Sequence, residues 1–397
     1  MYQSHLITFL QGPIIRISPH ELHISDPAFF PELYRQDGGR WDKYAFAYDA
    51  FPVRDATVAT ADHHVHKMRR APLGPFFSKA KVTARQNVIH GNVDKLCHRL
   101  LAFVKSGEQV NLGAAISALT QDVANQFITG KNSGALDEDD FSIGMMLVTQ
   151  DGGRVWTITK HLPWFGPLLM GVLPMEWMVK LTRDPNMRAF FKYLLEAERH
   201  TKHLMDLAAE GNSGTEYGRT IVHEILESED LPVEEKTHKR IVGDVVTVSS
   251  AGHESSATAM RLVLFHIFDR PEILKRLRVE LSSAATDPSG QLEIKTLEQL
   301  PFLTALLLEG LRLSPGIASR MARIAPDRDL VYDKWRIPAG TPVGMTALLL
   351  HLDEEVYGPD PWEFEPERWM DPEFRKNVEG RSFAPFSRGT RNCMGMQ

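Results

Sequence analysis

The sequence predicts a mainly α-helical protein that also contains small β-sheets. From His64 onward, apolar residues recur at the three- and four-residue spacing of a helix face. Short β-like runs beside turns lie near both ends of the chain. The 397 residues are 43% hydrophobic and 24% charged, which is typical of a globular protein and excludes a fibrous or largely disordered one. No linker divides the chain, so we expect a single domain over residues 1–397.

The N-terminal part is predicted to contain two strands and a short helix. Residues 14–25 (IIRISPHELHIS) form two β-like runs around a Pro-His turn. Asp26 and Pro27 then begin a helix that runs to about Tyr34. Amphipathic helices follow over residues 82–105, 112–129 and 187–207. The acidic segment 227–235 is expected to be a surface connection.

A very long helix is predicted over about residues 235–269, and Pro271 begins the next helix. A further helix over residues 301–312 ends before Ser314-Pro315-Gly316. Short strands with turns are then expected up to residue 351. The tail over residues 353–381, rich in Pro, Glu and Trp, is predicted to be a long ordered coil.

Charge and cysteine content exclude several classes of protein. The net charge of −6, from 45 basic and 51 acidic residues, gives no electrostatic footprint for nucleic acid. Only Cys97 and Cys393 occur, so there is no secreted disulfide framework and an intracellular, reducing compartment fits best. The most apolar run, residues 162–178, contains three prolines and cannot be one straight helix. We expect either a buried loop with short helices or an apolar surface against a pocket or a membrane.

The strongest chemical signal is FSRGTRNCMG over residues 386–395. Arg388 and Arg391 would favour the thiolate form of Cys393. Gly389 allows a tight turn. A helix beginning near Cys393 would direct backbone N–H groups at the sulfur. Such a site suits a metal-bound thiolate, and the alternative is a buried structural cysteine in a turn.

This pattern, F-x-x-G-x-R-x-C-x-G, resembles the haem-binding loop of the cytochrome P450 family. The matching positions are Phe386, Gly389, Arg391, Cys393 and Gly395. The resemblance implies haem b (iron protoporphyrin IX), with Cys393 as the proximal ligand to the iron and the other four as cofactor-binding residues. It also implies the cytochrome P450 fold.

A second signal is the pair Glu309 and Arg312, which share one face of a helix. Alone, the pair would be read as an ordinary surface ion pair. Its leucine-rich neighbours indicate at least partial burial, and buried charges need partners. Arg368 in FEPERW could return to Glu309. The three resemble the Glu-Arg-Arg triad of cytochromes P450, which implies a structural role in holding the coil that presents the cysteine.

A third signal is AGHESS over residues 251–256. Gly252 in a helix interior costs about 1 kcal/mol, which calls for a compensating role. The motif resembles the A-G-x-D/E-T-T/S motif of the cytochrome P450 helix on the distal haem face, implying a catalytic proton relay through Glu254 and Ser255. Ser255 replaces the usual threonine, so we expect less tightly coupled oxygen activation. His253 is expected to be packed or solvated.

Basic residues form the fourth signal. His66 and Arg70, in a predicted helix over residues 63–78, match the family's H-x-x-x-R element and share one face. Haem carries two propionates, which basic groups would bind. Arg323 resembles a further propionate ligand, and Arg320 is a weaker candidate. The alternative is a solvated basic face.

The motifs occur in the order typical of the family, from Gly12 to Gly395. Their sequences are most similar to those of fungal E-class, trichodiene oxygenase-like enzymes of secondary metabolism. This implies a monooxygenase that hydroxylates or epoxidises an apolar small molecule, such as a terpenoid or polyketide. Electrons would come from NADPH through a separate NADPH-cytochrome P450 reductase. We expect a monomer. The candidate pocket segments are residues 46–58, 242–251 and 315–321.

Two alternatives stay open: a P450-fold enzyme with non-oxygenating chemistry, and a haem-binding protein that is catalytically impaired. Family members usually begin with a membrane anchor and continue beyond the cysteine loop into a helix and a β-hairpin. The sequence here ends at Gln397. We therefore expect a fold truncated at both ends, incomplete at its C-terminus, with weak haem retention. We expect no transmembrane anchor, although the family acts at the cytosolic face of the endoplasmic reticulum.

Overall fold

The computed structural model describes two compact units. Unit 1 comprises Met1–Lys43 and Thr258–Met396, and unit 2 comprises Tyr44–Ala257. The described residues are 12–36, 38–48, 53–162, 164, 168, 173–211, 214, 218–284 and 292–396. Much of the apolar run 162–178 lies outside them, so its expected loop is not assessed. Within the described part of the chain, no helix has the length and apolar character to cross a membrane.

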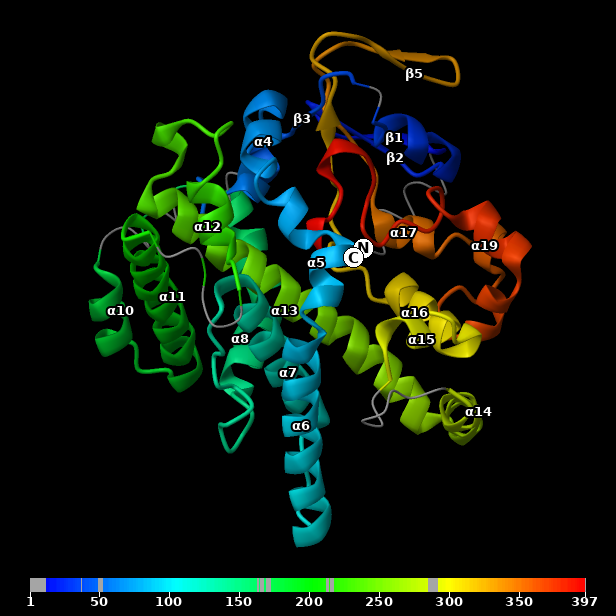
Figure 1. Ribbon diagram of the computed structural model, residues 1–397. Helices are drawn as coiled ribbons and strands as arrows, with labels where there is room; N and C mark the ends of the chain where they lie inside the picture. Colours follow the sequence, from blue (N-terminus) through cyan, green and yellow to red (C-terminus); the bar gives the residue numbers. More distant parts are fainter. Residues whose placement is uncertain are drawn as a thin grey trace. The chain divides into compact units, whose positions relative to one another are not determined.

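Unit 1 contains a five-stranded sheet and a separate hairpin (Figure 1). The sheet has the order β1 (Ile14–Ser18), β2 (Glu21–Ile24), β7 (Val343–Gly344), β4 (Arg323–Ile324), β3 (Asp42–Lys43). β1 and β2 are antiparallel, whereas β2 pairs with β7 in parallel, with Leu22 opposite Val343. The hairpin joins β5 (Leu330–Tyr332) to β6 (Trp335–Ile337). The predicted N-terminal strands are thereby confirmed.

The helices of unit 1 are short except for α13, α14 and α16. They are η1 (Pro27–Phe29), α2 (Phe30–Leu33), the part of α13 (His238–Asp269) from Thr258, α14 (Pro271–Ser282), α15 (Ile294–Leu297), α16 (Pro301–Leu313), α17 (Ala347–His351), α18 (Glu354–Tyr357), η5 (Pro366–Met370), α19 (Pro372–Val378), η6 (Gly389–Arg391) and η7 (Met394–Met396). One apolar core contains Phe30, Trp41 and Val343, and another joins α13, α14 and α16 around Leu306.

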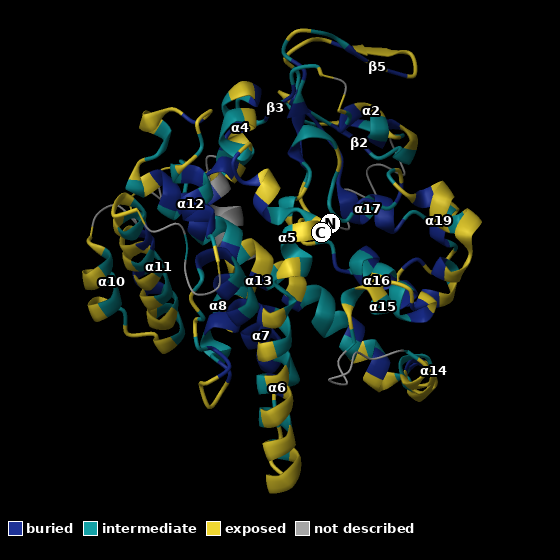
Figure 2. Ribbon diagram, in the orientation of Figure 1, coloured by how far each residue is buried: buried dark blue, intermediate teal, exposed yellow. Residues whose placement is uncertain are grey.

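Unit 2 is helical throughout most of its described length. Its elements are α3 (Ala45–Tyr48), η2 (Thr57–Ala59), α4 (His63–Arg70), η3 (Gly74–Phe77), α5 (Lys79–Ala84), α6 (Gln86–Ser106), α7 (Leu112–Thr129), α8 (Ile143–His161), α10 (Met175–Leu181), α11 (Pro185–Ala209), α12 (Ile221–Leu226), η4 (Val233–Glu235) and α13 up to Ala257. Helix α7 is largely buried, whereas much of α6 is exposed (Figure 2). The predicted mainly α fold with small sheets is confirmed.

Four predicted elements differ from the structure. The strands expected up to residue 351 stop at β7, and residues 347–351 form helix α17 instead. The helix expected over 82–105 is divided at Arg85, whose guanidinium bonds to the carbonyls of Phe127 and Arg219. The basic helix expected over 63–78 ends at Arg70, because prolines at positions 72 and 75 prevent its continuation. The tail expected to be coil contains α18, η5 and α19. Asp353 and Asp371 cap α18 and α19 by accepting the N–H groups of Glu355 and Glu373, each at 2.9 Å.

Candidate active site

The cysteine loop, residues 386–393, is a closed turn in unit 1. The Cys393 N–H donates to the Phe386 carbonyl at 2.9 Å, and the Asn392 N–H donates to the Gly389 carbonyl at 3.2 Å. Ser387 and Gly389 have φ values of 58° and 76°, so the backbone turns sharply twice. The Cys393 side chain is exposed. The loop thus presents a thiol at the surface of its unit.

Gly389 lies against the end of α2 with no space for a side chain. A Cβ atom there would come within 2.7 Å of the Tyr34 carbonyl oxygen and 2.8 Å of that of Arg35. Arg391 is buried and its Nη2 donates to the Trp41 carbonyl at 3.4 Å. Backbone contacts therefore hold the loop in place. A thiol on a loop held in this way can serve as a thiolate ligand to a metal ion.

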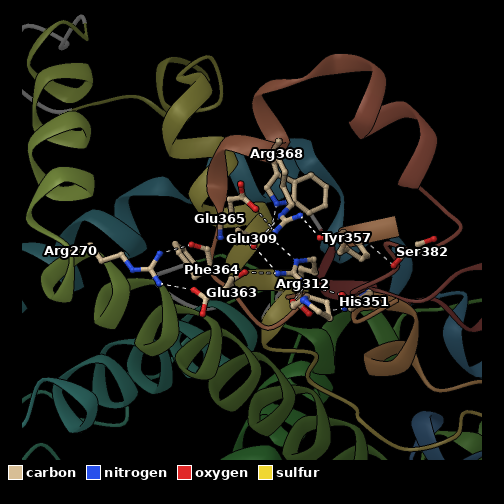
Figure 3. A network of polar contacts seen from close by, with 12 residues as sticks. Arg270, Glu309, Arg312, His351, Tyr357, Glu363, Phe364, Glu365, Arg368 and Ser382 are labelled. Carbon is tan, nitrogen blue, oxygen red and sulfur yellow. Dashed lines mark hydrogen bonds and ion pairs between the residues drawn. The ribbon is translucent and has the colours of Figure 1, made fainter. Parts of the chain in front are cut away.

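Glu309 and Arg312, on α16, form a fully buried ion pair (Figure 3). Arg312 donates from Nε and Nη2 to the two Glu309 carboxylate oxygens at 2.8 and 2.7 Å. Its remaining N–H groups reach three backbone carbonyls: His351 at 2.8 Å, Pro361 at 2.5 Å and Glu363 at 3.0 Å. A guanidinium has five N–H donors, and this geometry employs all of them. Such complete pairing is what a buried charge requires.

Arg368 also reaches Glu309, but at a longer distance. Its Nε lies 3.4 Å from Glu309 Oε1, within ion-pair range but without hydrogen-bond geometry. Its Nη groups donate to the Tyr357 carbonyl at 2.9 Å and to Glu365 Oε2 at 2.8 Å. The structure therefore brings Glu309, Arg312 and Arg368 together, with Arg368 contributing mainly through neighbours of the pair.

Two donors to Glu309 were missed in the sequence. The Glu365 N–H donates to Oε1 and the Trp369 indole N–H donates to Oε2, each at 2.8 Å. The tryptophan directly after Arg368 in PERW could have indicated this contact, because a buried indole N–H needs a hydrogen-bond acceptor. The backbone N–H carried no such signal.

His351 was also missed, although it joins this network to the segment before the cysteine loop. Its Nδ1 lies 2.9 Å from the Arg312 carbonyl, and its Nε2 lies 3.0 Å from the Ala384 nitrogen. Complete burial lowers the pKa of His351 to about 4. Nearby, the Tyr357 hydroxyl donates to the Ser382 carbonyl at 3.1 Å, and burial raises the pKa of Tyr357.

Arg323 and Arg320 occupy different environments in unit 1. Arg323 is buried on β4, and its Nη1 donates to the carbonyls of Met321 and Ala322 at 3.0 and 3.3 Å. Its guanidinium lies 5.1 Å from the centre of the Tyr34 ring. Arg320 is partly exposed and pairs with Glu21 at 3.2 Å.

The remaining predicted residues lie in unit 2. On α4, His66 is buried and Arg70 is partly buried. On α13, Glu254 Oε2 accepts a hydrogen bond from the Thr149 hydroxyl at 3.0 Å. The Ser255 hydroxyl donates to the Ala251 carbonyl one turn earlier, at 2.7 Å. His253 is buried.

Sequence reasoning missed a cluster in unit 2 formed by Thr57, Arg69, Glu235, Arg240 and Asp244. Arg69 donates to both oxygens of Glu235 at 2.7 and 3.0 Å, and Arg240 bridges Glu235 and Asp244 at 2.8 and 2.6 Å. Asp244 accepts the Thr57 N–H at 2.7 Å and its hydroxyl at 2.9 Å. The i, i+4 spacing of Arg240 and Asp244 could have indicated their ion pair, because residues at this spacing share a helix face.

The helical fold, the thiol loop and the buried Glu-Arg pair together define a haem-thiolate class of protein. The chain belongs to the cytochrome P450 family, whose model, described as "Cytochrome P450", matches residues 13–397. Haem iron is the cofactor of this family. The predicted family is confirmed.

Several curated relatives are fungal enzymes. The chain is 36% identical over 393 residues to cytochrome P450 monooxygenase tpcC of Cochliobolus heterostrophus, covering 98% of this chain and 73% of that protein. It is 33% identical over 391 residues to N-acetyltryptophan 6-hydroxylase ivoC of Emericella nidulans, covering 97% and 74%. It is 31% identical over 386 residues to cytochrome P450 monooxygenase TRI4 of Trichoderma arundinaceum, covering 97% and 73%. The chain is thus a cytochrome P450 monooxygenase of the fungal type that acts on small molecules.

Proposed function

We propose that the chain, as one catalytic domain, binds haem b through Cys393. We further propose that it hydroxylates or epoxidises an apolar small molecule. Electrons would come from NADPH through a separate NADPH-cytochrome P450 reductase. The observation that carries the proposal is the cysteine loop. It has an exposed thiol on a turn that is closed by the hydrogen bond from the Cys393 N–H to the Phe386 carbonyl. The buried network around Arg312 supports the segment leading into it.

The residues present fit this cofactor. Haem, when bound, supplies the activation of dioxygen, and a thiolate ligand favours O–O cleavage. Arg388 and Arg391 lie close before Cys393 in the sequence, and their positive charges would favour the anionic form of its thiol. Phe386, Gly389 and Gly395 shape the loop.

Propionate binding is proposed for Arg323, His66 and Arg70. Arg323 is the best supported, since its hydrogen bonds to described residues all come from Nη1. Its Nε and Nη2 thus form no hydrogen bond within the described chain and can serve a carboxylate. Arg320 is a weaker candidate, because Glu21 pairs with it.

Proton delivery is proposed for Glu254 and Ser255. The Thr149 hydroxyl orients the Glu254 carboxylate. The Ser255 hydroxyl holds its proton against the Ala251 carbonyl, and rotation about χ1 would release that proton for transfer. Serine lacks the methyl group that restricts threonine, so this rotation is less constrained. We therefore expect oxygen use to be less tightly coupled to product than in a threonine variant.

The proposed substrate class is an apolar terpenoid or polyketide. The family resemblance to trichodiene oxygenase-like enzymes supports this class. We also propose that the protein is a monomer that acts at the cytosolic face of the endoplasmic reticulum. Trp164, Trp177 and Leu181 of unit 2 are more than half exposed and support a peripheral membrane contact.

Expression with haem, followed by the carbon monoxide difference spectrum of the reduced protein, tests the ligand. We expect a thiolate-type Soret band that C393A abolishes and C97A retains, because Cys97 is exposed on α6. A wild-type protein without that band, or a C393A protein that keeps it, would overturn the proposal. Turnover with NADPH, reductase and labelled dioxygen then tests oxygenation. Product without label would favour isomerisation, desaturation or ring closure.

A further inference from the structure

We propose that His351 is a positioning residue that fixes the entry to the cysteine loop by accepting the Ala384 N–H at Nε2. This inference rests on the proposed role of Cys393 as the haem ligand. His351 is the last residue of α17 and is fully buried. Neither the family motifs nor the Glu-Arg-Arg triad assigns it a role.

The two hydrogen bonds of His351 determine its tautomer. A backbone N–H can only donate, so Nε2 must be the acceptor toward Ala384 at 3.0 Å. The proton therefore resides on Nδ1, which donates to the Arg312 carbonyl at 2.9 Å. Both ring nitrogens are then satisfied, and the ring packs beside Phe383 with centroids 5.6 Å apart.

Arg312 and His351 are joined in both directions. Arg312 Nη1 donates to the His351 carbonyl at 2.8 Å, while His351 Nδ1 donates to the Arg312 carbonyl. This reciprocal pair joins the end of α16 to the end of α17. Burial and the Arg312 charge keep the imidazole neutral, so its acceptor lone pair is available at neutral pH.

The contact continues from Ala384 into the loop. The Ala384 carbonyl accepts the Ser387 N–H at 3.0 Å, and the Phe386 carbonyl accepts the Cys393 N–H at 2.9 Å. His351 therefore holds the first residue of the turn 384–387, which leads into the cysteine loop. Because a thiolate ligand needs a fixed position, a loosened Ala384 would loosen the ligand as well.

Two variants of similar size separate the two bonds of His351. H351N places an amide near Nδ1, keeping the contact to Arg312 and losing the one to Ala384. H351Q places an amide oxygen near Nε2, keeping the contact to Ala384 and losing the one to Arg312. Both lose one buried hydrogen bond, so a purely structural role predicts equal effects.

The readouts are amide hydrogen exchange of Ala384 in the haem-free full chain and the carbon monoxide spectrum of the loaded protein. We expect H351N to exchange Ala384 about tenfold faster than wild type and to lose part of its thiolate-type band, with H351Q close to wild type in both. Unchanged exchange in H351N, or equal acceleration in both variants, would overturn the inference. If H351N does not fold, H351Q decides: a protected Ala384 amide supports the inference and an unprotected one overturns it. A wild-type chain without a thiolate band refutes the proposed function instead, while the exchange experiment still tests His351.

Discussion

The indole N–H of Trp369 donates to Glu309 Oε2 at 2.8 Å, inside a network where the glutamate is fully buried. The contact is shorter than the 3.4 Å approach of Arg368 Nε to the same carboxylate. A neutral aromatic donor therefore satisfies Glu309 more directly than the third charged member of the triad does. This arrangement makes Trp369 part of the support of the cysteine loop.

Replacing Trp369 by Phe should lower the free energy of unfolding by about 1–3 kcal/mol. The variant keeps most of the ring volume but leaves a buried carboxylate with one donor fewer. Urea denaturation measures the change. The control is W362F, because Trp362 is 63% exposed and should change stability by less than about 0.5 kcal/mol. Equal effects of the two variants would contradict the role of the indole N–H.

Arg312→Lys should destabilise the chain by about 3–5 kcal/mol or prevent its folding. An ammonium group has three donors and cannot replace the five of the guanidinium, so buried acceptors lose their partners. Urea denaturation again provides the measurement. The matched control is R276K, since Arg276 forms a half-exposed pair with Glu367 at 2.9 Å. If the free energy of unfolding of R312K lay within about 1 kcal/mol of the wild-type value, the five donors of the guanidinium would not be required.

Asp244→Asn should destabilise the cluster of unit 2 by about 3 kcal/mol, because it removes the charge that pairs with buried Arg240. D55N is the control: Asp55 forms an exposed pair with Lys239 and should contribute little. The thermal midpoints of both variants provide the comparison. Similar midpoints for D244N and D55N would show that the buried pair contributes no more than the exposed one.

Stability should fall between pH 6.5 and pH 4 through His23 and His351. Burial lowers both pKa values from 6.5 to about 4, so in this interval the unfolded chain binds protons that the folded chain does not. Each histidine contributes stability fully above pH 6.5, and about 2 kcal/mol of it is lost by pH 5.

Unfolding free energies at pH 7 and pH 5 test this for H351Q. We expect the variant to lose about 2 kcal/mol less than wild type over that interval, because glutamine does not titrate. Equal losses in the two proteins would mean that His351 is not held neutral in the folded state.

Local signals were readable in the sequence. Helices α7 and α16 match their predicted ranges to within one residue at each end, because buried apolar faces repeat at helical spacing. The Glu309–Arg312 pair is local as well, since i, i+3 residues share a face. The tail was misread because α18 and α19 are too short to show periodicity, and only their capping aspartates indicated them.

Side-chain contacts to the backbone could not be predicted from the sequence. Arg312 donates hydrogen bonds to the carbonyls of His351, Pro361 and Glu363. The His351 ring bonds to the carbonyl of Arg312 and to the N–H of Ala384. Every residue type carries these groups, so no residue pattern points to the partner. The approach of Arg368 to Glu309 was anticipated only through the family resemblance.

The carbonyl contacts of Arg312 also bear on which positions of this enzyme tolerate change. The guanidinium recognises the path of residues 361–363 through main-chain oxygens, while the Glu363 side chain is exposed. Substitutions at position 363 can therefore alter surface charge without disturbing the buried pair. In random mutagenesis, many residue types at position 363 should leave the enzyme functional, and very few at position 312. The sequence of this coil can therefore vary while Arg312 is retained.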